Sequence, residues 1–145
     1  PRSVRLRQEV SISLDDVYMG VIVQEEVPST MGGVLVTTNP ANRADFRNVY
    51  INASKKSVVH VVSGTDLPYQ FLYNTVERAG KTLTKGSATQ DLSEKEKSIL
   101  QNLAICGRLL QSHFSASYTF SDPVDIEWLA NGDELYILQL RPYAK

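Results

Sequence analysis

The stretch that decides the fold is Val124-Asp-Ile-Glu-Trp-Leu-Ala-Asn-Gly-Asp-Glu-Leu-Tyr-Ile-Leu-Gln-Leu-Arg-Pro142. Its two ends, Val124–Ala130 and Glu134–Leu140, have the composition of strands, and Asn131-Gly132-Asp133 between them is typical of a hairpin turn. Side chains alternate between the two faces of a strand. The first strand therefore has a polar face and an apolar face.

Asp125 and Glu127 share the polar face, and a three-residue turn at 132–134 predicts Arg141 across from Asp125 and Gln139 across from Glu127. A register shift of one residue would send one polar pair into the core, so the apolar pattern selects this register. Two interpretations stay open from geometry alone. One is a solvated face whose Asp–Arg pair contributes about 0.2–1 kcal/mol. The other is a site in which oxygen ligands from Asp, Glu and Gln bind Mg²⁺.

Upstream of the hairpin, the chain has the pattern of further short strands. A flexible turn is predicted at 28–33, and Ala79-Gly80 is predicted as the turn of a second hairpin. The predicted strands are Val17–Val27, Val34–Thr38, Asn48–Ala53, Ser57–Val62, Gln70–Val76 and Lys81–Thr84.

One long helix is predicted at Glu94–Phe114. Ser93 and Glu96 have the spacing of a capping box, and close packing is expected at Gly107. Apolar residues recur every three or four positions and define one face; they are Ile99, Leu100, Leu103, Cys106, Leu110 and Phe114. The predicted fold class is α+β, a mostly antiparallel sheet with one long helix on one face.

The chain has 145 residues and a net charge of −1, which predicts a single domain and argues against a nucleic-acid or membrane binder. Its one cysteine allows no intrachain disulfide, which suits a cytoplasmic location. No apolar run approaches the ~20 residues of a membrane span, and the N-terminus lacks a signal peptide. Because the chain begins without Met, we expect it to be a piece of a longer polypeptide.

Three ordered blocks carry a resemblance to a known family. They are Val23-Gln-Glu-Glu-Val-Pro28 with Gly33-Val-Leu35 and Thr37-Thr-Asn-Pro40, then Ile51-Asn-Ala53 with Val61-Val-Ser-Gly64, then Asp125-Ile-Glu-Trp128 with Leu135–Gln139 and Arg141-Pro142. Together they resemble the nucleotide-binding domain of the phosphoenolpyruvate synthase and pyruvate phosphate dikinase family, over roughly residues 18 to 142.

The resemblance implies an ATP-grasp fold, of which this chain is the C-terminal half, with ATP and Mg²⁺ as cofactors. By position, Gln24, Glu25 and Val27 line the adenine edge, and the loop that ends at Gly33 approaches the phosphates. Glu127 and Gln139 hold Mg²⁺ and the phosphates, Asp125 supports them, and Arg141 reaches a phosphate as the catalytic residue. The implied partners are the N-terminal ATP-grasp half and a separate phosphohistidine domain whose histidine ATP phosphorylates.

The chain departs from the family at residues 54–60, where many relatives carry Gly-Leu-Gly-Glu and this chain reads Ser-Lys-Lys-Ser-Val-Val-His. It also contains no phosphohistidine motif, so the fragment alone is expected to be inactive. The departure motivates an alternative, a degenerate module that binds nucleotide or a protein partner without transferring phosphate. A free-standing α+β interaction module is a third interpretation.

Overall fold

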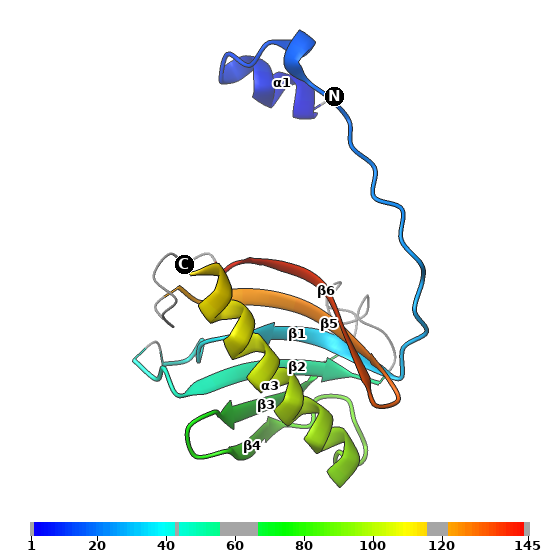
Figure 1. Cartoon of the computed structure of the whole chain (residues 1–145), viewed down its shortest axis with the longest axis vertical. Helices are drawn as coiled ribbons and strands as arrows, with labels where there is room; N and C mark the ends of the chain where they lie inside the picture. The colour runs from blue at the N-terminus through cyan, green and yellow to red at the C-terminus, as the bar shows by residue number, and fades with distance from the viewer. Residues whose placement is uncertain (1, 43, 56–66, 116–121, 144–145) are drawn as a thin grey trace.

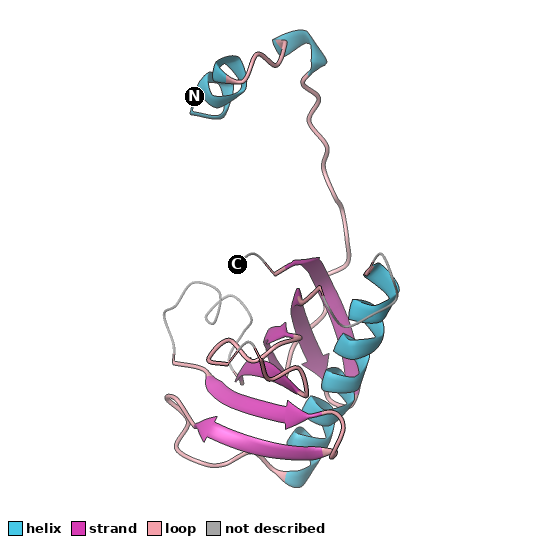
Figure 2. Ribbon diagram, turned by 90° about the vertical axis from the view of Figure 1, so that its left-hand side faces the viewer, coloured by secondary structure: helices cyan, strands magenta, loops and turns pink. Residues whose placement is uncertain are grey.

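The computed structural model describes residues 2–42, 44–55, 67–115 and 122–143. They form a six-stranded antiparallel sheet of order β4-β3-β2-β1-β5-β6 (Figure 1). Helix α3 (Glu94–Phe114) packs on one face of the sheet, so that helix and sheet form two layers (Figure 2). The strands are β1 (Met31–Val36), β2 (Asn48–Ser54), β3 (Tyr69–Asn74), β4 (Ala79–Thr84), β5 (Val124–Asn131) and β6 (Glu134–Pro142). The prediction of an α+β fold is confirmed, while the predicted strand at 57–62 lies outside the described residues.

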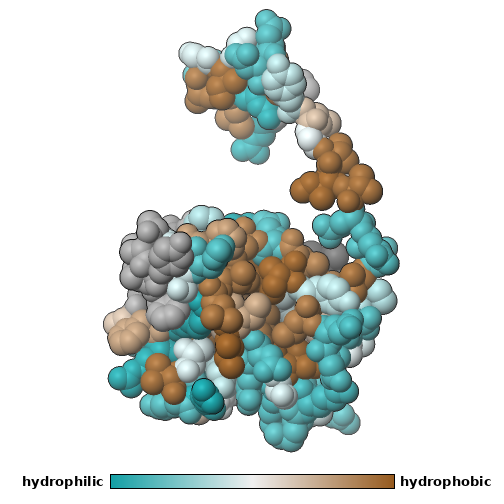
Figure 3. Space-filling view, in the orientation of Figure 1, coloured by the Kyte–Doolittle hydropathy of each residue, from teal (hydrophilic) through white to brown (hydrophobic). Residues whose placement is uncertain are grey.

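The predicted strand at Val17–Val27 is wrong, because this segment is extended but pairs with no other described strand. Its apolar side chains are largely open to solvent, and the stretch is visible between the N-terminal helix and the sheet (Figure 3). Before it lie a helix, α1 (Arg2–Glu9), and a short 3₁₀ helix, η1 (Leu14–Asp16), neither of which the sequence pattern predicted. A strand needs a neighbour to satisfy its backbone N–H and C=O groups, so β-propensity alone does not make this segment a strand.

Helix α3 begins with the predicted capping box. The Ser93 hydroxyl accepts from the Glu96 backbone N at 3.2 Å, and the Ser93 N donates to the Glu96 carboxylate at 2.8 Å. The prediction of close packing at Gly107 is also confirmed, since an added Cβ would lie 2.8 Å from a methyl carbon of Leu35. This glycine lets the helix approach β1 closely.

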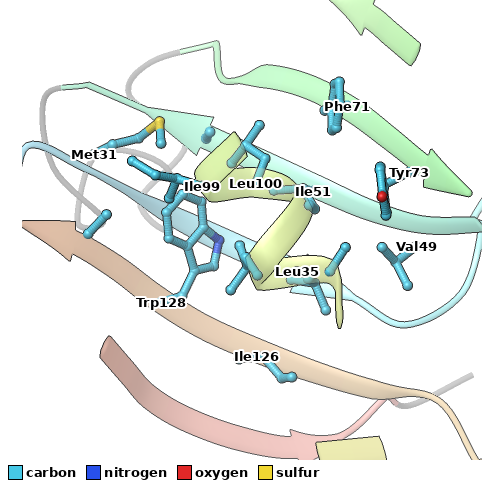
Figure 4. Close-up of a cluster of buried hydrophobic side chains, with 14 of the residues drawn as sticks. Met31, Leu35, Val49, Ile51, Phe71, Tyr73, Ile99, Leu100, Ile126 and Trp128 are labelled. Atoms are coloured by element: carbon cyan, nitrogen blue, oxygen red, sulfur yellow. The ribbon is translucent and has the colours of Figure 1, made fainter. Parts of the chain in front are cut away.

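The core lies between α3 and the sheet (Figure 4). Trp128 and Ile126 of β5 are fully buried there, together with Leu35 of β1, Ile51 of β2 and Leu100 of α3. The faces of β5 are therefore those predicted, with the apolar residues toward the helix. Burial of each large apolar side chain contributes about 1.5–3 kcal/mol.

The predicted apolar face of α3 holds over its first half and fails near its end. Phe114 is 62% exposed, whereas Arg108 and Gln111 are buried. Arg108 donates to the Thr37 carbonyl at 2.8 Å and to the Phe46 carbonyl at 2.5 Å. A polar side chain thus replaces the expected apolar contact and ties the helix to the β1–β2 connection.

Two predicted turns are misplaced. Met31, Gly32 and Gly33 belong to β1, although the composition predicted a flexible turn at 28–33. Ala79-Gly80 begins β4, and the turn of the second hairpin precedes it, with Arg78 in the left-handed region at φ 55°. At both places the glycines favour a turn by composition. At Gly33 its real role is a close approach of β1 and β2, because an added Cβ would lie 2.0 Å from the Asn52 carbonyl oxygen.

In the described part of the chain, no helix is long and apolar enough to cross a membrane.

We predict that Gly33→Ala lowers the free energy of unfolding by at least about 2 kcal/mol, because the new methyl group meets backbone that cannot move aside. Urea unfolding followed by circular dichroism measures this. The matched control is Gly20→Ala, where nothing lies within 4 Å of the added Cβ and the change stays within about 0.5 kcal/mol. Equal effects of the two substitutions would contradict the packing described for β1 and β2.

We also predict a pH dependence at Asp45. The Asn39 amide, which donates to Asp45 at 2.9 Å, is the first cause of a lowered pKa for this carboxyl. The resulting stabilisation is complete above the unfolded pKa of about 3.9 and is lost as the pH falls through the lower folded pKa. Asp45→Ala should cost about 1–2 kcal/mol at pH 7, and this difference should shrink below pH 4 in urea unfolding. A difference that stays constant down to pH 2 would be inconsistent with the assigned contacts.

Candidate functional site

The β5–β6 hairpin brings together the four polar side chains that the sequence singled out. Asp125 pairs with Arg141 and Glu127 pairs with Gln139, as predicted. Their shared face is the one opposite Trp128, and therefore opposite α3. Among the described residues no helix covers this side of the sheet (Figure 2).

The pairing arises by a different route from the one predicted. Asn131 pairs with Glu134, so the turn has two residues, and Gly132 takes a positive φ of 60° at its first position. This is the backbone pattern of a type II′ hairpin. The register then shifts between Glu127 and Trp128, which leaves Leu138 as the extra residue of a β-bulge. The shorter turn and the bulge cancel, and Gln139 still faces Glu127.

The bulge also changes the position of Tyr136. An unbulged strand with Gln139 facing Glu127 would have Tyr136 on the core side together with Leu138, but Tyr136 pairs with Leu129, on the face of β5 opposite Trp128. Its hydroxyl donates to Glu134 at 2.7 Å, and this hydrogen bond is the first cause of its raised pKa. Leu138 itself is 38% exposed. Tyr136 therefore lies on the same side of the hairpin as the four polar residues.

Asp125 and Arg141 form an ion pair at the edge of the site. Arg141 Nε donates to Asp125 Oδ2 at 2.8 Å, and Arg141 Nη2 lies 2.7 Å from the same oxygen. The bond to Asp125 raises the pKa of the guanidinium. The Asp125 side chain is only 12% exposed, and in the described part of the chain its other oxygen, Oδ1, has no hydrogen-bond partner. One carboxylate oxygen is thus held and the second remains an unused acceptor.

The donor set suits a hard divalent cation. It offers the Glu127 carboxylate, the unpartnered Asp125 oxygen and the Gln139 amide oxygen. The described residues contain no group of three or more His, Cys, Asp or Glu side chains that could hold a metal ion by itself. Mg²⁺ commonly takes one or two protein carboxylates and completes its coordination with water and phosphate oxygens. The residues present fit Mg²⁺ in that shared form.

Strand β1 lies between β5, which carries Asp125 and Glu127, and β2. Val34 pairs with Glu127 on one side and with Asn52 on the other. Asn52 therefore shares the face of Glu127, and its Oδ1 is a second buried oxygen without a partner among the described residues. No local sequence pattern points to Asn52, because none reveals which residues meet across two strand pairings.

The remaining candidate residues come from the segment before β1 and from β1 itself. Gln24 and Glu25 are exposed, and Val27 is half-buried, in the extended segment before β1. Glu25 lies close enough to the hairpin that its charge is the last of the causes that raise the pKa of Tyr136. Gly33 lies inside β1 rather than in a phosphate-approaching loop.

The whole chain matches one known protein family. The family model for the pyruvate phosphate dikinase AMP/ATP-binding domain matches residues 1–145. A probable phosphoenolpyruvate synthase of Archaeoglobus fulgidus is 25% identical over 169 aligned residues, which cover 98% of this chain and 20% of that protein. The uncharacterized phosphotransferase YvkC of Bacillus subtilis is 30% identical over 148 residues, covering 94% of this chain and 18% of its own length.

A probable phosphoenolpyruvate synthase of Methanothermobacter thermautotrophicus is 28% identical over 160 residues, covering 97% of this chain and 22% of that protein. The chain thus spans about a fifth of the length of these curated relatives.

We predict a coupling of less than about 1 kcal/mol between Asp125 and Arg141, because the arginine side chain is 60% exposed. A double-mutant cycle with Asp125→Asn and Arg141→Gln, followed by urea unfolding, measures it. The coupling should fall further in 1 M salt, which screens exposed charges. The pair Lys95–Asp133, at 3.0 Å and more exposed, is the control and should couple more weakly. A coupling above about 2 kcal/mol would assign the pair a structural role instead.

Proposed function

The chain belongs to the family of pyruvate phosphate dikinase AMP/ATP-binding domains, and on this premise we propose that it forms the ATP- and Mg²⁺-binding part of a larger phosphotransferase. The parent resembles phosphoenolpyruvate synthase or pyruvate phosphate dikinase. In this proposal ATP phosphorylates a histidine on another domain, and the chain is the C-terminal half of an ATP-grasp domain in a cytoplasmic enzyme. The observation that carries it is the shared sheet face of Asp125, Glu127, Gln139 and Arg141.

Each residue has a definite role in this proposal. Glu127 and Gln139 hold Mg²⁺, and the unpartnered Asp125 oxygen supports the same cation. Arg141, already positioned by Asp125, contacts a phosphate of the nucleotide. When bound, Mg²⁺ neutralises charge on the phosphates. Phosphoryl transfer depends mainly on such positioning and charge neutralisation, which makes carboxylates, an amide and an arginine a sufficient protein contribution from this side.

The segment before β1 has a second role. We propose that Gln24, Glu25 and Val27 line the adenine edge. The proximity of the Glu25 charge to Tyr136 supports a base position at the hairpin end of the site. The exposed apolar residues of this segment support pairing with the N-terminal ATP-grasp half. A phosphate contact from the backbone of Gly33 remains a prediction.

The test uses the complete polypeptide that carries this domain, with Mg²⁺ and ATP labelled at the β or the γ phosphate. We expect acid-labile, base-stable label on the protein, and retention of the β label identifies transfer of the dikinase type. Glu127→Gln should reduce labelling at least about 100-fold, because the proposed Mg²⁺ site loses its carboxylate ligand and the charge on the transferred phosphoryl group is then poorly neutralised. Glu77→Gln, the same substitution at a 63% exposed side chain far from the site, should leave labelling unchanged.

Other outcomes separate the alternatives. Bound nucleotide without label would replace the proposal with a degenerate, non-catalytic module. Full labelling of Glu127→Gln would refute the assigned metal site and leave the family function intact. The 145-residue chain alone should not turn over ATP, since it contains neither the acceptor histidine nor the other half of the cleft.

A further inference from the structure

A cavity of about 290 Å³ lies at the end of the sheet where β1 begins and β2 ends, beside the first turn of α3. It contains none of the residues of the nucleotide site. Along β1, Met31 in the cavity is three residues from Val34, which pairs with Glu127. Three residues of a strand span roughly 10 Å. The cavity is therefore separate from the polar face of β5 and β6.

The floor of the cavity is apolar and well ordered by packing. Met31, Ala53 and Leu92 line it and are at most 5% exposed. Tyr69, also buried, completes this floor and donates its hydroxyl proton to Asp91 at 2.7 Å. Small-molecule sites typically combine such an apolar surface with a few convergent polar groups. The volume accommodates one small organic molecule.

Two cations lie at the rim. Lys55 follows the end of β2 and Lys85 follows the end of β4, so they come from different strands to the same cavity. Their side chains are 50% and 49% exposed. Ser87 and Thr89 add hydroxyl groups to the same lining. The rim thus carries positive charge and hydrogen-bond donors above an apolar floor.

The carboxylates paired with these lysines have other donors. Asp91 accepts from the Tyr69 hydroxyl and from the Leu92 N at 2.9 Å, while Lys85 is 3.9 Å away. Glu96 pairs with Lys55 at 2.8 Å and also accepts from the Ser93 N at 2.8 Å as part of the helix cap. When either lysine turns toward a ligand, one oxygen of its carboxylate keeps its other donors, and the oxygen that faced the lysine belongs to a partly exposed side chain that water can reach. Lys85, the more loosely paired, is the better placed to do so.

We propose that this cavity binds a small organic anion, with the anionic group between Lys55 and Lys85 and an apolar body on the floor formed by Met31 and Leu92. The site does not depend on the proposed phosphotransferase activity. Tight binding requires both the anionic group and the apolar body. The lysines are half exposed, so an ion pair with them alone is little more favourable than hydration of the separate charges. A molecule with only one of the two parts binds more weakly.

The test titrates phenyl phosphate into the 145-residue chain and follows amide shifts by nuclear magnetic resonance. We expect saturable binding with a Kd of about 1 mM or tighter, with the largest shifts around Ala53, Lys85 and Leu92. Lys85→Gln should weaken binding at least about 5-fold. Lys95→Gln is the matched control, because Lys95 pairs with Asp133 and does not line the cavity, and its Kd should stay within about 2-fold of the original value.

Ala88→Trp gives a second test, since Ala88 lines the cavity and is exposed, so a large side chain fills the space without entering the core. Binding should be lost while the circular dichroism spectrum is retained. Inorganic phosphate and benzyl alcohol, which carry one part each, should bind at least about 5-fold more weakly. The proposal is overturned if phenyl phosphate does not saturate the chain, if inorganic phosphate binds as tightly, or if the two lysine variants weaken binding equally.

Discussion

The burial of Trp128 beneath α3 is the constraint on which the candidate site depends. The indole is fully buried with Ile126, and its ring nitrogen has no hydrogen-bond partner among the described residues, so apolar contact alone stabilises it. Turning β5 over would expose both side chains and bury Asp125 and Glu127. Each buried apolar side chain is worth about 1.5–3 kcal/mol, and each buried unpaired charge costs several kcal/mol. The chemistry of one face is thus set by packing on the other.

The hairpin shows how far the sequence can predict such a site. The apolar and polar alternation predicted the pairing of Glu127 with Gln139 correctly, although the turn that was to produce it is wrong. A two-residue turn and a bulge at Leu138 give the same pairing as an unbulged three-residue turn. The alternation specifies which residues must face the core, and several turn geometries satisfy it. Pairing is therefore predictable here, while the bulge and the position of Tyr136 are not.

Other features depend on partners that a local pattern does not contain. The helix cap at Ser93 was predictable because both of its hydrogen bonds lie within four residues. Arg108 was not, since its acceptors are carbonyl groups some 60 to 70 residues away, and an arginine in a helical pattern is normally expected in solvent. The same reason explains Val17–Val27, whose composition favours a strand but which pairs with no described strand.

Charge sets a further requirement on the proposed nucleotide site. Asp125 and Glu127 place two negative charges on the sheet face, and Arg141 adds one positive charge, which leaves a net charge of −1. A nucleotide triphosphate is itself strongly anionic, so this face does not attract it without a cation. In the proposed site, Asp125, Glu127 and Gln139 would hold Mg²⁺, and its two positive charges would outweigh the net negative charge of this face. The charge on the phosphates would still exceed the positive charge available, so the proposed function requires further lysine or arginine side chains from outside this face. On the proposed function, the same charge count that suits this face to a metal ion predicts weak nucleotide binding by these 145 residues alone.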